Sequence, residues 1–137
     1  MKSYYNQIES RGITAESLRE RDVVLTTAPW FDPAHQKPKR PFGILNALVE
    51  VGITMIPRVT SDSNKRMPYA VRSSNDPPYT RPGYYLCNFI RKITCYEFNS
   101  LPDRIHKGRM ADEEYRQIIE RARKYRETQI HRAEYWE

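Results

Sequence analysis

Two proline-rich segments limit what this sequence can fold into. Residues 31–41 (FDPAHQKPKRP) and 73–82 (SSNDPPYTRP) carry three prolines each. Proline lacks a backbone donor and restricts the residue before it, so neither segment suits the interior of a helix or of a central strand. We expect both segments to be exposed connectors. A chain of 137 residues has room for one hydrophobic core, so the sequence predicts a single domain.

The stretches outside these connectors show strand-like and helix-like patterns. Runs of β-branched and aromatic residues predict strands over 22–30, 53–60, 66–72 and 83–94, and the last of these has the strongest strand character. In the segment 42–51 (FGILNALVEV), apolar residues recur at steps of three and four, and a glycine follows that can end a helix. This segment is therefore predicted to be a short amphipathic helix, with Phe42, Leu45, Leu48 and Val49 on its apolar face.

A second helix is predicted over residues 111–136. One stripe of this segment is apolar, and Glu and Arg fill most of the other positions. Both signs of charge mix on the polar face, which is typical of a solvent-facing helix that covers a sheet. The stripe expected to pack on the sheet consists of Tyr115, Ile118, Ile119, Ala122 and Tyr125.

Positive charge is concentrated in the middle of the sequence. The net charge is +6, and residues 37–92 hold ten basic and three acidic residues, whereas the flanking parts are close to balance. These basic residues are interleaved with tyrosines, the mixture expected where phosphates are neutralised and bases stack. An ordinary solvated basic surface explains the charge alone equally well. The RNA-binding residues predicted from this pattern are Lys37, Lys39, Arg40, Arg58, Lys65, Arg66, Arg72, Arg81, Tyr84, Arg91 and Lys92.

No arrangement of residues in the sequence predicts catalysis or a metal site. His35, His106 and His131 have no partner motif, and the spacing of Cys87 and Cys95 matches neither a zinc knuckle nor a redox pair. Cys87 has aromatic neighbours, so burial is expected to raise the pKa of its thiol and suppress its reactivity. We expect a non-catalytic protein without cofactor or metal, with reduced thiols in a reducing compartment.

The sequence also argues against a membrane span and against common targeting signals. It holds no apolar stretch of about 18 residues, because Asn46, Glu50 and Gly52 interrupt the longest apolar run. The first 21 residues carry three glutamates and no apolar core, which fits neither a secretory signal nor an organellar transit peptide. Any targeting signal is expected to be cryptic or to have been removed.

Five segments appear in an order and spacing that resemble one family. They are VVLTTAPW, FGILNALVEVG, ITMIPRVT, KRMPYAV and PGYYLCNF, and the stretch that they span covers about half of the sequence. In this order they are similar to the bacterial-type ribosomal protein six of the small subunit, in its mitochondrial form. The most specific pieces, residues 65–71 and 82–86, resemble the hairpin that leads into that family's third strand. Strand alternation there leaves Lys65, Arg66 and Arg72 outside, where rRNA phosphates can lie.

The resemblance implies an α+β fold, a ferredoxin-like antiparallel sheet with a helix packed on one face, to which this sequence adds the long C-terminal amphipathic helix. It implies a structural role in the small subunit of the mitochondrial ribosome, in the matrix, with contacts to small-subunit rRNA and to ribosomal protein eighteen of that subunit. The C-terminal helix is expected to contact other ribosomal proteins. The resulting division is an N-terminal extension at 1–21, a ferredoxin-like RNA-binding core at 22–98, and a linker with the C-terminal helix at 99–137.

A second class of function also fits the composition. An accessory, non-catalytic subunit of a mitochondrial respiratory-chain assembly can be small, basic and proline-rich, and can carry a long charged helix. The two classes differ in their surfaces, because a ribosomal protein should gather positive charge on one face, whereas an accessory subunit should show broad apolar contact patches.

Overall fold

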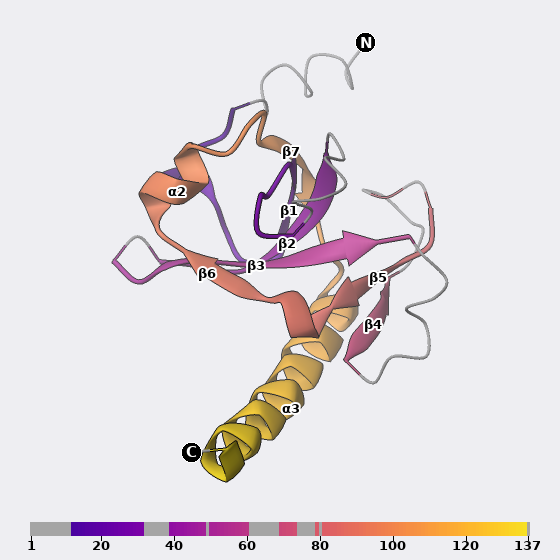
Figure 1. Ribbon diagram of the computed structural model, residues 1–137. Helices are drawn as coiled ribbons and strands as arrows, with labels where there is room; N and C mark the ends of the chain where they lie inside the picture. The colour runs from indigo at the N-terminus through magenta and orange to yellow at the C-terminus, as the bar shows by residue number, and fades with distance from the viewer. Residues whose placement is uncertain are drawn as a thin grey trace.

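The computed structural model describes residues 12–31, 39–48, 50–60, 69–73, 79 and 81–136, with the side chains of the last helix described as far as Arg126. Within these ranges the chain forms one antiparallel sheet of seven strands and two α-helices (Figure 1). The strands are β1 (Asp22–Thr26), β2 (Arg40–Leu48), β3 (Gly52–Val59), β4 (Ala70–Ser73), β5 (Gly83–Leu86), β6 (Arg91–Ile93) and β7 (Ile105–Arg109). The helices are α2 (Cys95–Asn99) and α3 (Asp112–Trp136), and short 3-10 turns, η1 and η3, occupy Ala15–Ser17 and Cys87–Phe89.

The sheet is organised around β3. Its strand order is β4-β5-β3-β2-β1-β7, and β6 also pairs with β3. Both β5 and β6 lie along the edge of β3 opposite β2: the end of β3 pairs with β5 through Arg58 and Tyr85, and its beginning pairs with β6 through Ile53 and Ile93. The 3-10 turn Cys87–Phe89 separates these two pairings, so the strand predicted over 83–94 is divided into β5 and β6.

The ferredoxin-like fold class is wrong, because the sheet has seven strands and residues 42–51 do not form the predicted helix. They lie mostly in β2, which pairs with β1 on one side and β3 on the other. Ile44 pairs with Met55 and Asn46 with Thr54, so Leu45 is the extra residue of a β-bulge. Strand alternation places Phe42 and Leu45, three residues apart, in the cores on opposite faces of the sheet, and because both are apolar their spacing resembles a helical stripe.

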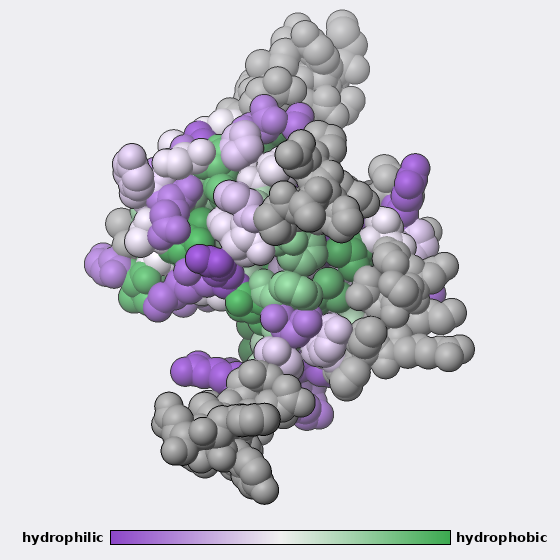
Figure 2. All heavy atoms as spheres, viewed as in Figure 1, coloured by the Kyte–Doolittle hydropathy of each residue, from purple (hydrophilic) through white to green (hydrophobic). Residues whose placement is uncertain are grey.

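Two apolar cores lie on the two faces of the sheet. On one face, Val24, Phe42 and Ile53 pack with residues of η1 and α2. On the other face, Val23, Ile56 and Tyr85 pack with Ile118 of α3. Figure 2 shows the view of Figure 1 with hydrophilic residues over α2 and β6 and apolar residues over the middle of the sheet. Hydrophilic residues therefore flank the apolar middle of this face.

The predicted C-terminal helix is confirmed as α3, and its apolar stripe packs on the sheet as expected. Ile118 is fully buried, and Tyr115, Ile119 and Ala122 contact the same core. The Tyr115 hydroxyl donates a hydrogen bond of 2.9 Å to the Leu45 carbonyl oxygen at the bulge of β2. The last turns of α3 extend beyond the sheet (Figure 1).

The other predicted strands correspond to observed strands with shifted ends. The prediction over 22–30 corresponds to β1, the one over 53–60 to β3, and the one over 66–72 to β4, although residues 66–68 lie outside the described residues. Strand β7 was not predicted, and it pairs with β1 at the edge of the sheet. Across the described part of the chain, neither helix is long and apolar enough to span a bilayer.

Candidate nucleic-acid interface

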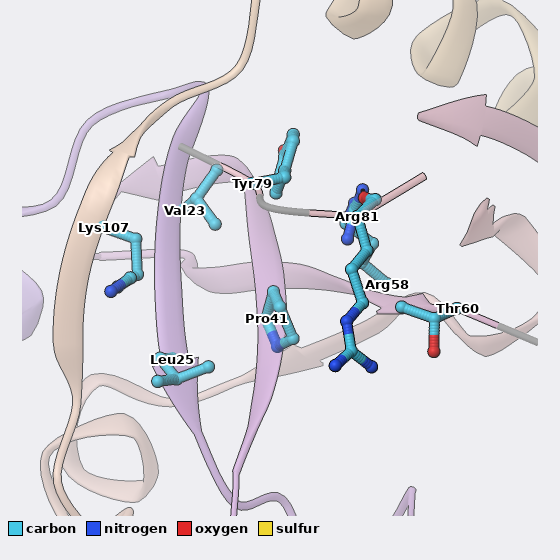
Figure 3. A pocket seen from close by; sticks show the side chains of 8 residues that line it. All are labelled: Val23, Leu25, Pro41, Arg58, Thr60, Tyr79, Arg81 and Lys107. Carbon is cyan, nitrogen blue, oxygen red and sulfur yellow. Dashed lines mark hydrogen bonds between the residues drawn. The ribbon is translucent and has the colours of Figure 1, made fainter. Parts of the chain in front are cut away.

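A small basic pocket lies on the sheet where β7, β1, β2 and β3 run side by side (Figure 3). Its volume is about 230 Å³. Apolar side chains of β1 and β2 line its middle, with Lys107 of β7 on one side and the arginines on the other. The pocket is lined by Val23, Leu25, Pro41, Arg58, Thr60, Tyr79, Arg81 and Lys107. Three of these eight residues are cationic and none is a carboxylate, so the pocket favours an anion.

Arg58 is the fixed cation of this basic pocket. Only 4% of its surface is exposed, and its guanidinium carbon lies 3.8 Å from the centre of the Tyr79 ring. Its Nε donates to Ser73 Oγ at 2.7 Å, and its Nη2 donates to the Arg81 carbonyl oxygen at 2.5 Å. Burial lowers the pKa of the guanidinium from its ordinary value, but that value is so high that arginine keeps its charge at neutral pH.

Behind Arg58, a carboxylate is connected to the pocket through a hydroxyl. Ser73 Oγ donates a hydrogen bond of 2.7 Å to Glu114 Oε1, and both residues are buried. Burial raises the pKa of Glu114, while the hydrogen bond from Ser73 and the charge of Arg58 partly oppose that rise. Arg58, Ser73 and Glu114, on β3, β4 and α3, form what we call the buried relay.

Two buried tyrosines complete the wall of the buried relay. The hydroxyls of Tyr79 and Tyr85 are hydrogen-bonded to each other, and their rings meet at an interplanar angle of 70°. Burial raises the pKa of Tyr79 to about 12 and that of Tyr85 well above its ordinary value. Both tyrosines therefore stay neutral over the physiological range, and Arg58 and Glu114 are the residues of the buried relay that can carry charge.

A glycine makes the close approach around Arg58 feasible. A Cβ atom on Gly83 would lie 2.7 Å from the Val59 carbonyl oxygen and 2.8 Å from the guanidinium carbon of Arg58. Any side chain at this position would collide with rigid backbone and with Arg58, which the Tyr79 ring, Ser73 and the Arg81 carbonyl oxygen hold in place. Gly83 therefore lets β5 lie close enough to β3 for Arg58 to be enclosed.

A second group of residues, the aromatic–arginine cluster, consists of Trp30, Phe31, Arg40, Phe42, Phe89 and Arg91. The guanidinium carbon of Arg40 lies 5.0 Å from the Phe31 ring centroid, and that of Arg91 lies 5.3 Å from the Trp30 centroid. Phe42 is buried beneath Trp30 and Phe31, with ring centroids 6.4 and 6.3 Å away. Phe89 packs edge-on to Phe31 at 5.1 Å and is 43% exposed. The cluster offers partly exposed rings held by cations, a surface on which bases can stack.

The basic pocket and the aromatic–arginine cluster meet at the beginning of β2. Arg40 belongs to the cluster, and its neighbour Pro41 lines the pocket. Successive side chains of a strand point to opposite faces, so the first residues of β2 supply both sites. An extended ligand that wraps around the end of β2, from one face of the sheet to the other, would contact both.

The structure brings together some of the predicted RNA-binding residues and separates others. Arg40 and Arg91 lie in the cluster, and Arg58 and Arg81 lie at the pocket, where burial restricts Arg58 to contacts inside it. The remaining residues are dispersed or lie in parts of the chain that are not described. Lys39 forms an ion pair with Asp103, Arg72 faces Tyr84 across β4 and β5, and Lys92 is exposed on β6, while Lys37, Lys65 and Arg66 are outside the described residues.

The site also contains residues that the sequence pattern did not single out. Lys107 lies on β7, whose sequence is too polar to be recognised as a strand, and Thr60 directly follows β3. Trp30 and Phe31 stand where the first proline-rich connector begins. An aromatic pair only a few residues before the basic segment KPKR was the available signal.

Within the described ranges, the cysteines and the other possible metal ligands outline no further site. Cys87 is buried, and burial raises its pKa to about 12, which agrees with the expectation of an unreactive thiol. Among the residues whose positions are described, no group of three His, Cys, Asp or Glu is placed to hold a metal ion.

No protein-family model matches this sequence, and no curated protein matches it at a significant level.

Proposed function

We propose that this protein binds single-stranded RNA, with a backbone phosphate in the basic pocket and bases stacked on the aromatic–arginine cluster. The observation that carries the proposal is a pocket lined by three cations and no carboxylate, next to partly exposed aromatic rings. Proteins that bind single strands combine these two elements, a basic groove for the backbone and rings for the bases.

The pocket suits a phosphate better than a whole nucleotide. Its volume of about 230 Å³ is below the roughly 300 Å³ at which small-molecule pockets begin. Lys107 and Arg81 are exposed and can reach toward a phosphate, while Arg58 supplies a cation that does not need to be ordered on binding. A preorganised donor reduces the entropy lost when the ligand binds.

The aromatic–arginine cluster favours a single strand over a duplex. Stacking on an aromatic ring requires an unpaired base whose face is accessible, and it contributes about 1–3 kcal/mol per base. In a duplex the bases already stack on one another, so no base face would be accessible to the rings of Trp30 and Phe89.

A role in the small subunit of the mitochondrial ribosome, beside ribosomal protein eighteen, is the setting we propose for this binding. That part of the proposal rests on the resemblance in sequence order alone, and the ferredoxin-like fold implied by the same resemblance is wrong. RNA binding is supported separately, by the chemistry of the two sites.

The alternative, an accessory subunit of a respiratory assembly, has weaker support. Over the described ranges, the large apolar side chains that are exposed lie on separate elements: Leu48 and Val51 at the turn between β2 and β3, Phe89 in η3 and Tyr96 on α2. Phe89 already belongs to the aromatic–arginine cluster. A subunit packed into a large assembly would need a broader apolar patch.

Fluorescence anisotropy with labelled oligonucleotides tests the proposal. We expect the protein to bind a single-stranded oligouridine more tightly than a duplex RNA of equal length, with an affinity that falls as salt rises because phosphate contacts release counterions. The replacement of Arg81 and Lys107 together by Gln should weaken binding and flatten the salt dependence, and Arg72→Gln plus Lys124→Gln removes the same charge elsewhere. Equal affinity for both RNAs, or equal loss in both double variants, would overturn the proposal.

A further inference from the structure

Arg58 belongs both to the basic pocket and to the buried relay. Arg58 lines the pocket, and its Nε donates to Ser73 Oγ at 2.7 Å. Ser73 in turn donates to Glu114 Oε1 at 2.7 Å, which connects the pocket to the first turn of α3. The pocket on the sheet and the carboxylate behind it are thus joined by two short hydrogen bonds.

The negative charge of Glu114 acts on the pocket from behind. Charges that are buried interact much more strongly than charges in water, because the surrounding protein screens them weakly. An ionised Glu114 therefore offsets part of the positive field that Arg58 projects into the pocket. A neutral Glu114 would leave that field intact, and an anion in the pocket would in turn disfavour the ionised carboxylate.

We propose that Glu114, acting through Ser73 on Arg58, sets how tightly the basic pocket holds an RNA phosphate, and that RNA binding shifts the Glu114 carboxylate toward its protonated form, with uptake of a fraction of a proton. This inference rests on the proposed function. The proton comes from the solvent, and no bond to RNA forms or breaks. Glu114 is a positioning and tuning residue, which does not touch the ligand itself.

Among Glu114 and the residues that surround it, Glu114 is the group expected to gain or lose a proton as the pH changes. From β3 it faces Arg58, and from β4 it faces Ser73, which does not ionise in this range. Tyr79 and Tyr85 complete the wall, and both keep their protons up to strongly alkaline pH. Burial raises the pKa of Glu114, which moves its titration toward neutral pH, where it can respond to an anion.

Because the coupling is reciprocal, the proposal predicts the sign of the change in RNA affinity, and a purely structural role for Glu114 predicts the opposite sign. If the anion favours protonation, then protonation must favour the anion by the same factor. Binding should therefore tighten as the pH falls through the pKa of Glu114. A residue that merely supported the fold would weaken RNA binding when it was replaced, whereas removal of the Glu114 charge should strengthen it.

The test compares Glu114→Gln with Glu113→Gln, its exposed neighbour in the same turn of α3. The probe is a single-stranded oligouridine with a 5′-hydroxyl end, because a terminal phosphate titrates near pH 6 and an internal phosphodiester does not. At pH 7.5 we expect Glu114→Gln to bind about fivefold more tightly than wild type and Glu113→Gln to remain close to it. Between pH 7.5 and pH 5, wild type should tighten and Glu114→Gln should change little.

Two further measurements distinguish a failure of the relay from a failure of RNA binding. Calorimetry of wild type in buffers of different ionisation enthalpy should detect proton uptake on binding, which does not depend on how well any variant folds. Stabilisation by sulfate, measured as a rise in melting temperature, should be larger for Glu114→Gln than for Glu113→Gln.

If RNA binds but the two variants match and no proton is taken up, the relay is refuted and RNA binding stands. If oligouridine does not bind and sulfate still separates the variants, the RNA function fails and the relay stands; if neither occurs, both are wrong.

Discussion

The guanidinium carbon of Arg58 lies 3.8 Å from the centre of the Tyr79 ring, so a cation is enclosed between the sheet and an aromatic side chain. The same residue is held by Ser73 and by the Arg81 carbonyl oxygen. Arg58 therefore holds Tyr79 and Arg81 against β3 and forms one wall of the basic pocket.

Replacement of Arg58 should damage the fold as well as the pocket. Arg58→Met keeps much of the side-chain volume but leaves Glu114 buried without its positive counterpart, and removal of one partner of a buried charge pair typically costs about 3–5 kcal/mol. We expect a loss of that order in the free energy of unfolding, measured by urea denaturation. Exposed Arg72 on β4 serves as the control, since Arg72→Met should change stability little. An unchanged urea midpoint in Arg58→Met would contradict the buried pair.

Two glycines of the sheet should respond differently to the addition of one methyl group. In Gly83→Ala the new Cβ meets the Val59 carbonyl oxygen at 2.7 Å, and backbone cannot yield cheaply. In Gly43→Ala the closest atom, at 2.9 Å, is the terminal methyl of Met110, which a flexible side chain can move aside. We expect Gly83→Ala to lose about 1–3 kcal/mol of stability, as overpacked cores do, and Gly43→Ala to lose less. Thermal denaturation of both variants checks the order, and a larger loss in Gly43→Ala would reverse it.

The stability of the protein should depend on pH through Glu114. Burial raises the pKa of this carboxyl above its ordinary 4.5, so the folded protein holds the proton more tightly than the unfolded chain does. The stability that this proton contributes is present in acid and is lost as the pH rises from 4.5 through the folded-state pKa. The free energy of unfolding of wild type, measured from pH 4 to pH 7, should fall relative to that of Glu114→Gln over this window. Parallel pH profiles would show that Glu114 is not perturbed.

The sequence predicted α3, in which a single face is buried, and the strands β1 and β3, which are buried on both faces. The stripe of α3 follows the helical period because only one side of that helix packs on the sheet, and β1 and β3 were recognisable from their β-branched runs. In β2 both faces are buried, so apolar residues of opposite faces, such as Phe42 and Leu45, recur at steps of three. That repeat is physically the signature of a helix, and local pattern alone could not distinguish the two.

The sequence predicted the chemistry of the candidate site better than it predicted which residues form the site. The concentration of basic residues in the middle of the chain pointed to Arg40, Arg58, Arg81 and Arg91, which do lie at the two sites. Lys107 joins them only because β7 pairs with β1, a contact between residues more than 80 positions apart in the sequence. Long-range strand pairing of this kind leaves no local pattern, and β7 has few apolar residues to reveal it.

The central claim, that RNA bases stack on the aromatic–arginine cluster, is tested most directly by a pair of neighbouring residues. Arg91 and Lys92 are both exposed on β6, and the side chain of Arg91 lies over the Trp30 ring. Each substitution by Gln removes one positive charge, so the general electrostatic loss is matched. Measured by anisotropy with single-stranded oligouridine, Arg91→Gln should weaken binding about tenfold, as the loss of roughly 1.4 kcal/mol of stacking and charge would. Lys92→Gln should weaken it about twofold or less, and equal losses in the two variants would contradict the account.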